Sequence, residues 1–107
     1  MNAPEPDFSS LSEVDRLVHE PMRLLVMSNL YVVESADYTH LMRQAGLTWG
    51  NLSAHLSKLE EAGYIQVEKT YRGKRPYTLV RLSDQGRAVF RAYVSRMKTV
   101  LNNLDVD

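Results

Sequence analysis

The sequence predicts an α+β fold that is mainly helical, in which a helix-turn-helix is followed by a β-hairpin and a long C-terminal helix. Three observations support this fold class. Two helical segments, each ended by a glycine, are separated by a tight turn. Two segments of alternating apolar and polar residues then flank a loop with its own glycine and proline. Finally, an apolar seam at helical spacing runs almost to the end of the chain.

Length and composition restrict the class of protein. The chain has 107 residues, of which 44% are hydrophobic and 24% charged, so we expect a flexible tail (1–10) and a single domain (11–107). The absence of cysteine excludes disulfides, thiolate metal sites and thiol-based redox sensing. No apolar run approaches the roughly 20 residues that span a bilayer. The acidic start also lacks the features of a signal peptide. These features predict a soluble, cytoplasmic protein.

The charge is balanced overall but unevenly distributed. Thirteen basic and thirteen acidic residues give a net charge of zero. Residues 1–38 carry a balance of −5, whereas residues 39–81 carry +4. A basic middle segment is what a face that meets a phosphate backbone would need, although solvated charges can also segregate by chance.

The first three helices are predicted from apolar spacing and from end signals. The first spans 11–19 with Ser12 as N-cap, and the second spans 21–33 with Pro21 in its first turn. Thr39 is the expected N-cap of the third helix, which Gly46 ends.

The remaining elements follow in order. Thr48 caps a fourth helix, 49–62, which Gly63 ends. The segments 64–70 and 77–82 form a hairpin around a loop, 71–76. Ser83 caps the last helix, about 84–104.

The ordered set of segments resembles the small winged-helix regulators related to the MarR and ArsR groups. The matching segments are 21–24, 46–48, 51–65 (NLSAHLSKLEEAGYI), 72–76 (RGKRP) and 82–87. The resemblance implies a homodimeric, sequence-specific double-stranded DNA-binding transcriptional regulator, usually a repressor, with helix 49–62 in the major groove. It identifies no small-molecule effector. ArsR-type metal sensors commonly carry cysteine pairs, which are absent here.

The period of helix 49–62 separates a core face from a candidate DNA face. Leu52, Leu56 and Leu59 share one side, so we expect them to be buried. The other side is small or hydrogen-bonding with one cation, a surface that can approach base edges closely. The hairpin loop 71–76, which corresponds to the wing of these regulators, adds long cations suited to phosphate contact or minor-groove insertion. The predicted DNA-binding residues are Thr48, Trp49, Gly50, Asn51, Ser53, Ala54, Ser57, Lys58, Arg72, Lys74 and Arg75.

Two residues of this helix allow more than one interpretation. Trp49 is either a hydrophobic plug or an indole donor near DNA, and we favour DNA proximity. His55 lies at the edge of the buried stripe, which favours a packed structural histidine over a base contact. Because the three histidines are not paired at helical spacing, we expect neither a metal site nor a cofactor.

The last helix carries a heptad-type seam. A domain this small cannot easily bury the whole seam. We therefore expect a homodimer interface, in which the first half of the helix packs within its own chain and the second half pairs with the other copy. The alternative is that the seam packs entirely on the chain's own helices. The predicted interface residues are Phe90, Tyr93, Val94, Met97, Val100, Leu101 and Leu104.

Three classes of function compete. A dimeric DNA-binding regulator is favoured by the basic wing. A winged-helix module that binds a protein partner without base readout remains open, because the face of helix 49–62 carries only one cation. An enzyme is disfavoured, since the sequence has no nucleophile–base arrangement, no Gly-rich phosphate loop and no metal cluster.

Overall fold

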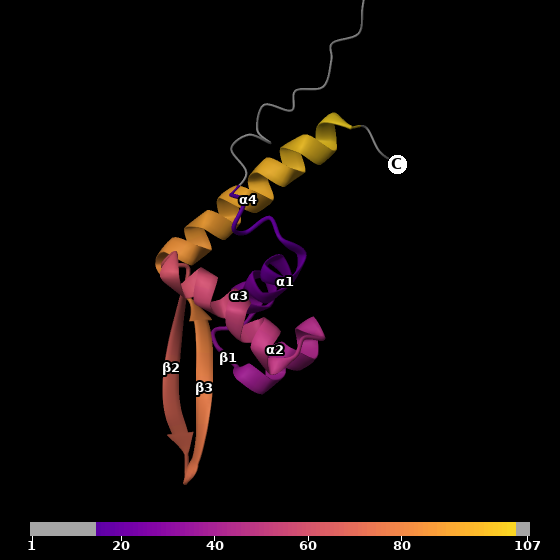
Figure 1. The fold of residues 1–107 in the computed structure, drawn as a ribbon. Coiled ribbons are helices and arrows are strands. Elements are labelled where there is room, and N and C mark those ends of the chain that lie inside the picture. Colours follow the sequence, from indigo (N-terminus) through magenta and orange to yellow (C-terminus); the bar gives the residue numbers. More distant parts are fainter. Residues whose placement is uncertain (1–14, 105–107) are drawn as a thin grey trace, which may run out of the picture.

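The computed structural model describes residues 15–104, which form four helices and three strands (Figure 1). β3 is the central strand of an antiparallel sheet of order β1-β3-β2. The predicted fold class, mainly helical with a hairpin wing and a long C-terminal helix, is confirmed. In chain order the elements are α1 Pro21–Val32, β1 Ala36–Asp37, α2 Tyr38–Ala45, α3 Trp49–Glu61, β2 Ile65–Arg72, β3 Arg75–Leu82 and α4 Asp84–Asn103.

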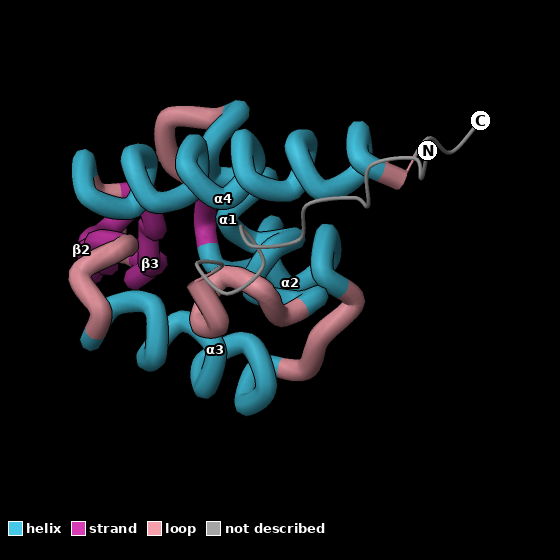
Figure 2. Tube along the Cα trace, turned by 90° about the horizontal axis from the view of Figure 1, so that it is seen from above, coloured by secondary structure: helices cyan, strands magenta, loops and turns pink. Residues whose placement is uncertain are grey.

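The helices form a layered body from which the β2–β3 hairpin projects (Figure 1). Figure 2 shows α3 and α4 on opposite sides of this body, with α1 and α2 between them. A single cluster of buried apolar side chains connects the layers, so α3 and the base of the hairpin share one core. Its members are Val18, Val26, Met27, Leu30, Ala36, Tyr38, Leu41, Leu52, Leu56, Leu59, Ile65, Val80, Leu82, Phe90 and Tyr93.

Local hydrogen bonds explain where the helices begin and end. Thr48 and Ser83 are the N-caps of α3 and α4, as predicted. Gly46 ends α2 in the left-handed region with φ +64°. The prediction that Thr39 caps α2 is wrong. Asp37 is the cap, because its Oδ1 accepts a 2.7 Å hydrogen bond from the His40 amide, and the helix therefore begins before Thr39.

The segment before α1 departs from the prediction of a helix over 11–19. The expected N-cap Ser12 and residues 1–14 lie outside the described residues, and residues 16–18 form a turn. The carboxylate of Asp15 explains this turn, because it accepts a 2.8 Å hydrogen bond from the Leu17 amide. Asp15 also accepts a hydrogen bond from the Tyr64 hydroxyl. This bond, together with burial, raises the pKa of Tyr64 to about 12. The turn is thus anchored to the start of the hairpin.

The hairpin is longer than predicted, and its loop is shorter. The expected loop over 71–76 is wrong, because Arg72 pairs with Arg75 and only Gly73 and Lys74 remain between the strands. Gly73 has φ +66°, which a glycine adopts without steric cost, and this permits the tight turn. The two-residue strand β1 was not predicted. It pairs Ala36 with Val80 and Asp37 with Leu79.

Gly86 lies at the junction between the hairpin and α4. The Tyr64 carbonyl accepts a 3.0 Å hydrogen bond from the Ser83 amide, which holds the start of β2 against the start of α4. A Cβ on Gly86 would lie 1.9 Å from that same oxygen. Only glycine fits this close approach of α4 to the Tyr64 backbone, just before β2.

Candidate nucleic-acid interface

The two faces of α3 differ as the sequence predicts. Leu52, Leu56 and Leu59 are almost completely buried. Opposite them, Ser53 is half-buried, and the other predicted contact residues are open to solvent. These exposed residues are Thr48, Trp49, Gly50, Asn51, Ala54, Ser57 and Lys58.

A pair of stacked aromatic rings fixes the first turn of α3. The ring centroids of Tyr38 and Trp49 lie 3.9 Å apart, and the Tyr38 hydroxyl donates a 2.8 Å hydrogen bond to the Trp49 carbonyl. Tyr38 is buried, whereas 59% of the Trp49 side chain is exposed. Trp49 therefore lies on the surface with one ring face supported by Tyr38, rather than acting as a plug.

Gly50 has no packing role within the described chain. A Cβ added there would meet no heavy atom within 4 Å. Glycine in a helix costs up to about 1 kcal/mol relative to alanine. Since this small residue is not needed for packing or for a turn, it leaves space for a group outside the chain.

His55 is held by residues of the same chain. Its Nδ1 lies 3.2 Å from Arg23 Nη1 and 3.7 Å from Glu20 Oε2. Arg23 is itself buried, and its Nε donates a hydrogen bond to the Leu17 carbonyl. These contacts agree with the prediction of a packed structural histidine and connect α3 to the start of α1.

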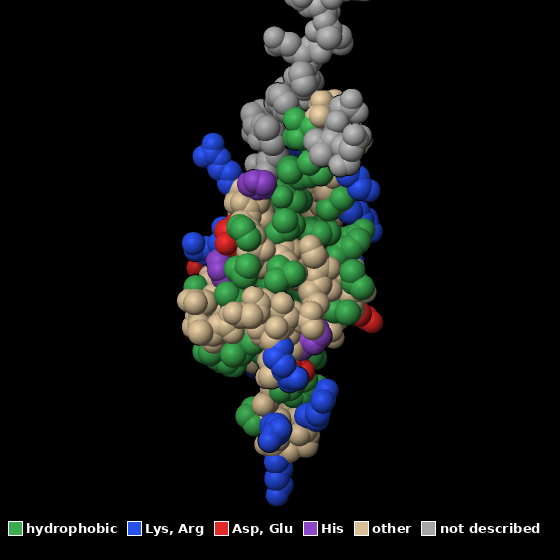
Figure 3. Space-filling view, turned by 90° about the vertical axis from the view of Figure 1, so that its right-hand side faces the viewer, with side chains coloured by type: hydrophobic (Ala, Val, Ile, Leu, Met, Phe, Trp, Pro, Cys, Tyr) green, Lys and Arg blue, Asp and Glu red, His purple; other side chains and the backbone are tan. Residues whose placement is uncertain are grey.

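The wing presents its cations at the far end of the molecule. Arg72, Lys74 and Arg75 are all exposed. In Figure 3, Lys and Arg side chains gather at the lower end, over the wing. Arg72 lies over the ring of Tyr77 at 4.9 Å, which orients its guanidinium. Further up the hairpin, Arg81 is paired with Glu68 at 2.6 Å.

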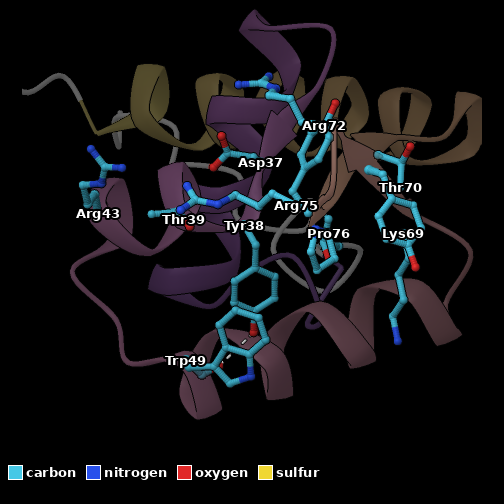
Figure 4. Close-up of a pocket in the computed structure, with 13 residues that line it drawn as sticks. Asp37, Tyr38, Thr39, Arg43, Trp49, Lys69, Thr70, Arg72, Arg75 and Pro76 are labelled. Atoms are coloured by element: carbon cyan, nitrogen blue, oxygen red, sulfur yellow. Dashed lines mark hydrogen bonds between the residues drawn. The ribbon is translucent and has the colours of Figure 1, made fainter.

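A hollow of about 780 Å³ separates α2 and the start of α3 from the wing. We call it the wing hollow, and it is lined by residues 37–39, Arg43, Trp49, 69–72 and 75–78. Figure 4 shows the Tyr38 and Trp49 rings stacked at one end, with Arg75 extending from the wing towards the α2 side. The hollow therefore joins the recognition surface of α3 to the wing.

The hollow contains residues that the sequence prediction missed. Arg43 and Thr39 come from α2, and Lys69 and Tyr71 come from β2. The basic balance of residues 39–81 indicated that Arg43 and Lys69 belong to the basic part of the chain. The position of Arg43 beside the wing depends on how α2 packs against β3, which local sequence does not specify.

The residues of the predicted dimer seam differ in burial along α4. Phe90 and Tyr93 belong to the core, with Val94 and Met97 packed against it. Val100 is buried as well. Leu101 and Leu104 are 55% and 44% exposed. The first half of α4 thus packs within the chain, and its end leaves large apolar side chains uncovered.

Residues 15–104 include no helix long and apolar enough to cross a membrane. In the same part of the chain, no three His, Cys, Asp or Glu residues are grouped as metal ligands would be.

Comparison with known proteins places the fold among DNA-binding regulators. A family model described as a winged helix DNA-binding domain matches residues 22–101. An uncharacterised protein of Methanocaldococcus jannaschii is 28% identical over 84% of this chain and 98% of its own length. A transcriptional regulator homologue from Pyrococcus horikoshii has a TM-score of 0.86 and 29% identity, covering 91% of this chain and 98% of its own. A putative MarR-family transcriptional regulator from Enterococcus faecalis has the same fold, with a TM-score of 0.71 and 23% identity over 92% and 89% of the two chains.

Proposed function

Because the chain belongs to the winged helix DNA-binding domain family, we propose that it is a homodimeric transcriptional repressor that recognises a specific sequence in double-stranded DNA. α3 enters the major groove, and the tip of the wing contacts the backbone or the adjacent minor groove. The protein then competes with other proteins for the stretch of duplex that it covers. This role requires no catalytic step.

One observation carries the proposal: a helix face of mostly small and hydrogen-bonding side chains, with Lys58 as its one cation, lies beside an exposed basic hairpin. Gly50, Asn51 and Ala54 allow α3 to approach base edges, where an Asn amide can pair with adenine. The wing cations supply the sequence-independent attraction to phosphates. α3 and the base of the hairpin share one core, which connects the two surfaces.

Selection of bound sequences from random duplex DNA tests the proposal. The expected result is enrichment of a short inverted repeat, whose half-sites lie about one helical turn (roughly 34–36 Å) apart, because two-fold protein symmetry is mirrored in the site. A pool that shows no enrichment after repeated rounds would contradict sequence-specific binding and favour the alternative of a protein-interaction module.

We expect Asn51→Ala and Ser53→Ala each to weaken binding to the selected site by about 1–3 kcal/mol, because each removes a side chain that reads a base edge. Binding to random duplex should barely change. Fluorescence anisotropy with the two DNAs measures the difference. Asn102→Ala, an exposed asparagine at the end of α4, is the matched control. An equal loss of affinity for both DNAs would show that these two side chains do not read base edges.

Gly50→Ala should change stability and binding in opposite directions. The methyl group meets nothing within the chain, so the free energy of unfolding should rise by up to about 1 kcal/mol. On DNA the same methyl group occupies the space next to the base edges, and affinity for the selected site should fall by about 1–3 kcal/mol. Urea unfolding and anisotropy give the two values. Unchanged affinity would place this turn of the helix away from the groove.

Leu101→Glu should raise the dimer dissociation constant at least about tenfold, because it buries an unpaired charge in an apolar interface. Sedimentation equilibrium measures the shift. Thr99→Glu adds the same charge to an exposed position outside the seam and should leave assembly unchanged. A wild-type protein that is monomeric at tens of micromolar would contradict the proposed dimer.

A further inference from the structure

Two exposed aromatic side chains face the same hollow. Trp49 and Tyr71 have 59% and 71% of their surfaces exposed, and both line the wing hollow. Among residues 15–104, no other aromatic side chain has more than half of its surface open to solvent. Aromatic surface is more stable when it is removed from water. These two exposed rings are therefore available to pack against a flat, apolar group of another molecule.

The charge around these rings is strongly positive. Arg43, Lys69, Arg72 and Arg75 line the hollow, and the ion pairs among residues 15–104 involve none of them. Asp37 is the only acidic residue in the lining, and its carboxylate already accepts the His40 amide. An occupant of the hollow should therefore carry negative charge.

The size of the hollow restricts that occupant further. About 780 Å³ lies within the range of clefts that enclose small organic groups, roughly 300–1,000 Å³. A duplex can lie across such a hollow but cannot enter it. A second copy of this chain placed symmetrically over it would set arginines against arginines. Flat rings joined by phosphates combine the required shape and charge.

We propose that the wing hollow binds single-stranded nucleic acid, with unpaired bases stacking on Trp49 and Tyr71 and the backbone following the four cations. The Trp49 ring packs against Tyr38 with centroids 3.9 Å apart and planes tilted by 32°, and more than half of the Trp49 side chain stays open to a base. This is the combination by which proteins bind single strands without reading sequence: aromatic platforms inside a basic groove. It is an activity separate from reading a duplex, and its test does not depend on the duplex result.

The chain contains one tryptophan, so intrinsic fluorescence reports directly on the hollow. The full chain is titrated with oligothymidylate and, in parallel, with oligouridylate. We expect saturable quenching of Trp49 with both, because stacking requires a base and no particular sugar. Labelled oligonucleotides give the affinities by anisotropy. A response to only one of the two strands would show that the sugar or the thymine methyl group, rather than stacking, determines binding, and would contradict the proposal.

Two substitutions separate stacking from charge. Tyr71→Ala should weaken oligothymidylate binding about 5- to 150-fold, the range expected for one lost base stack. Tyr71→Phe keeps the ring and should bind as the wild type does. Arg43→Ala should reduce the slope of log K against log salt by about 0.7. Val32→Ala, on an exposed part of α1 that does not line the hollow, is the control.

Three results would overturn the proposal. The first is no binding of either single strand while the selected duplex still binds, which leaves the proposed function intact. The second is binding without Trp49 quenching and without loss in Tyr71→Ala. The third is equal quenching by polyglutamate, which would make the hollow a site for acidic chains. Conversely, single-strand binding without duplex selection would contradict only the proposed function.

Discussion

Replacing Gly86 by alanine is expected to lower the free energy of unfolding by about 3 kcal/mol or more. The added Cβ would lie 1.9 Å from the Tyr64 carbonyl oxygen and 2.8 Å from its carbon, so α4 must move away from the hairpin. That movement breaks the hydrogen bond from the Ser83 amide to the same oxygen. Domains are stable by about 5–15 kcal/mol, so much of the protein would unfold at moderate temperature.

Urea denaturation followed by circular dichroism measures this loss. Gly50→Ala is the matched control, since it makes the same chemical change where no atom lies within 4 Å. The two variants should differ in sign: Gly86→Ala destabilises, and Gly50→Ala stabilises. A Gly86→Ala protein as stable as the wild type would contradict this close approach of α4 to the Tyr64 backbone.

Changing Arg72, Lys74 and Arg75 together to alanine should weaken binding to the selected site and to random duplex alike. Each phosphate contact releases condensed counterions, so losing three contacts should flatten the slope of log K against log salt by up to roughly 3 units. Arg75 adds a further effect if its side chain enters the minor groove, namely a changed preference for A·T-rich flanks. Stability should fall by only about 0.5–1 kcal/mol, through the lost contact of Arg72 with the Tyr77 ring.

Anisotropy over a range of salt concentrations measures this slope. The control is a triple variant with the same change in net charge, Arg16→Ala, Arg91→Ala and Lys98→Ala, made at exposed positions that do not line the wing hollow. It should keep the wild-type slope. If both triple variants behave alike, net charge rather than the wing accounts for DNA affinity. If neither differs from the wild type, the wing lies outside the interface.

Sequence alone predicts the elements whose ends are marked locally. Thr48 and Ser83 each accept a backbone amide three residues ahead, so α3 and α4 begin where expected. The same reasoning fails for Thr39, because Asp37 satisfies the equivalent amide two residues earlier. It also fails for the turn at Asp15, whose carboxylate bonds to Tyr64, a residue distant in sequence.

One part of the candidate site could likewise be predicted from the sequence, and the other part could not. The exposed face of α3 follows from helical period, because Leu52, Leu56 and Leu59 determine which side is buried. The wing hollow does not follow from any local pattern. It requires Arg43 from α2 and Arg75 from β3 to line the same hollow. That placement depends on β1, a strand of only two residues, which is too short to show a periodic pattern in the sequence.

β1 also connects the two parts of the proposed DNA interface. Asp37 pairs with Leu79 of the hairpin and caps α2, so the same residue joins the helix-turn-helix to the wing. This connection limits how far the helix-turn-helix can move relative to the base of the wing. If α3 and the wing contact one duplex as proposed, a duplex whose groove spacing differs from the distance between them must bend to fit, and bending costs least at flexible pyrimidine–purine steps. Preferred sites should thus contain such steps between the two contacted segments, at positions that no side chain touches.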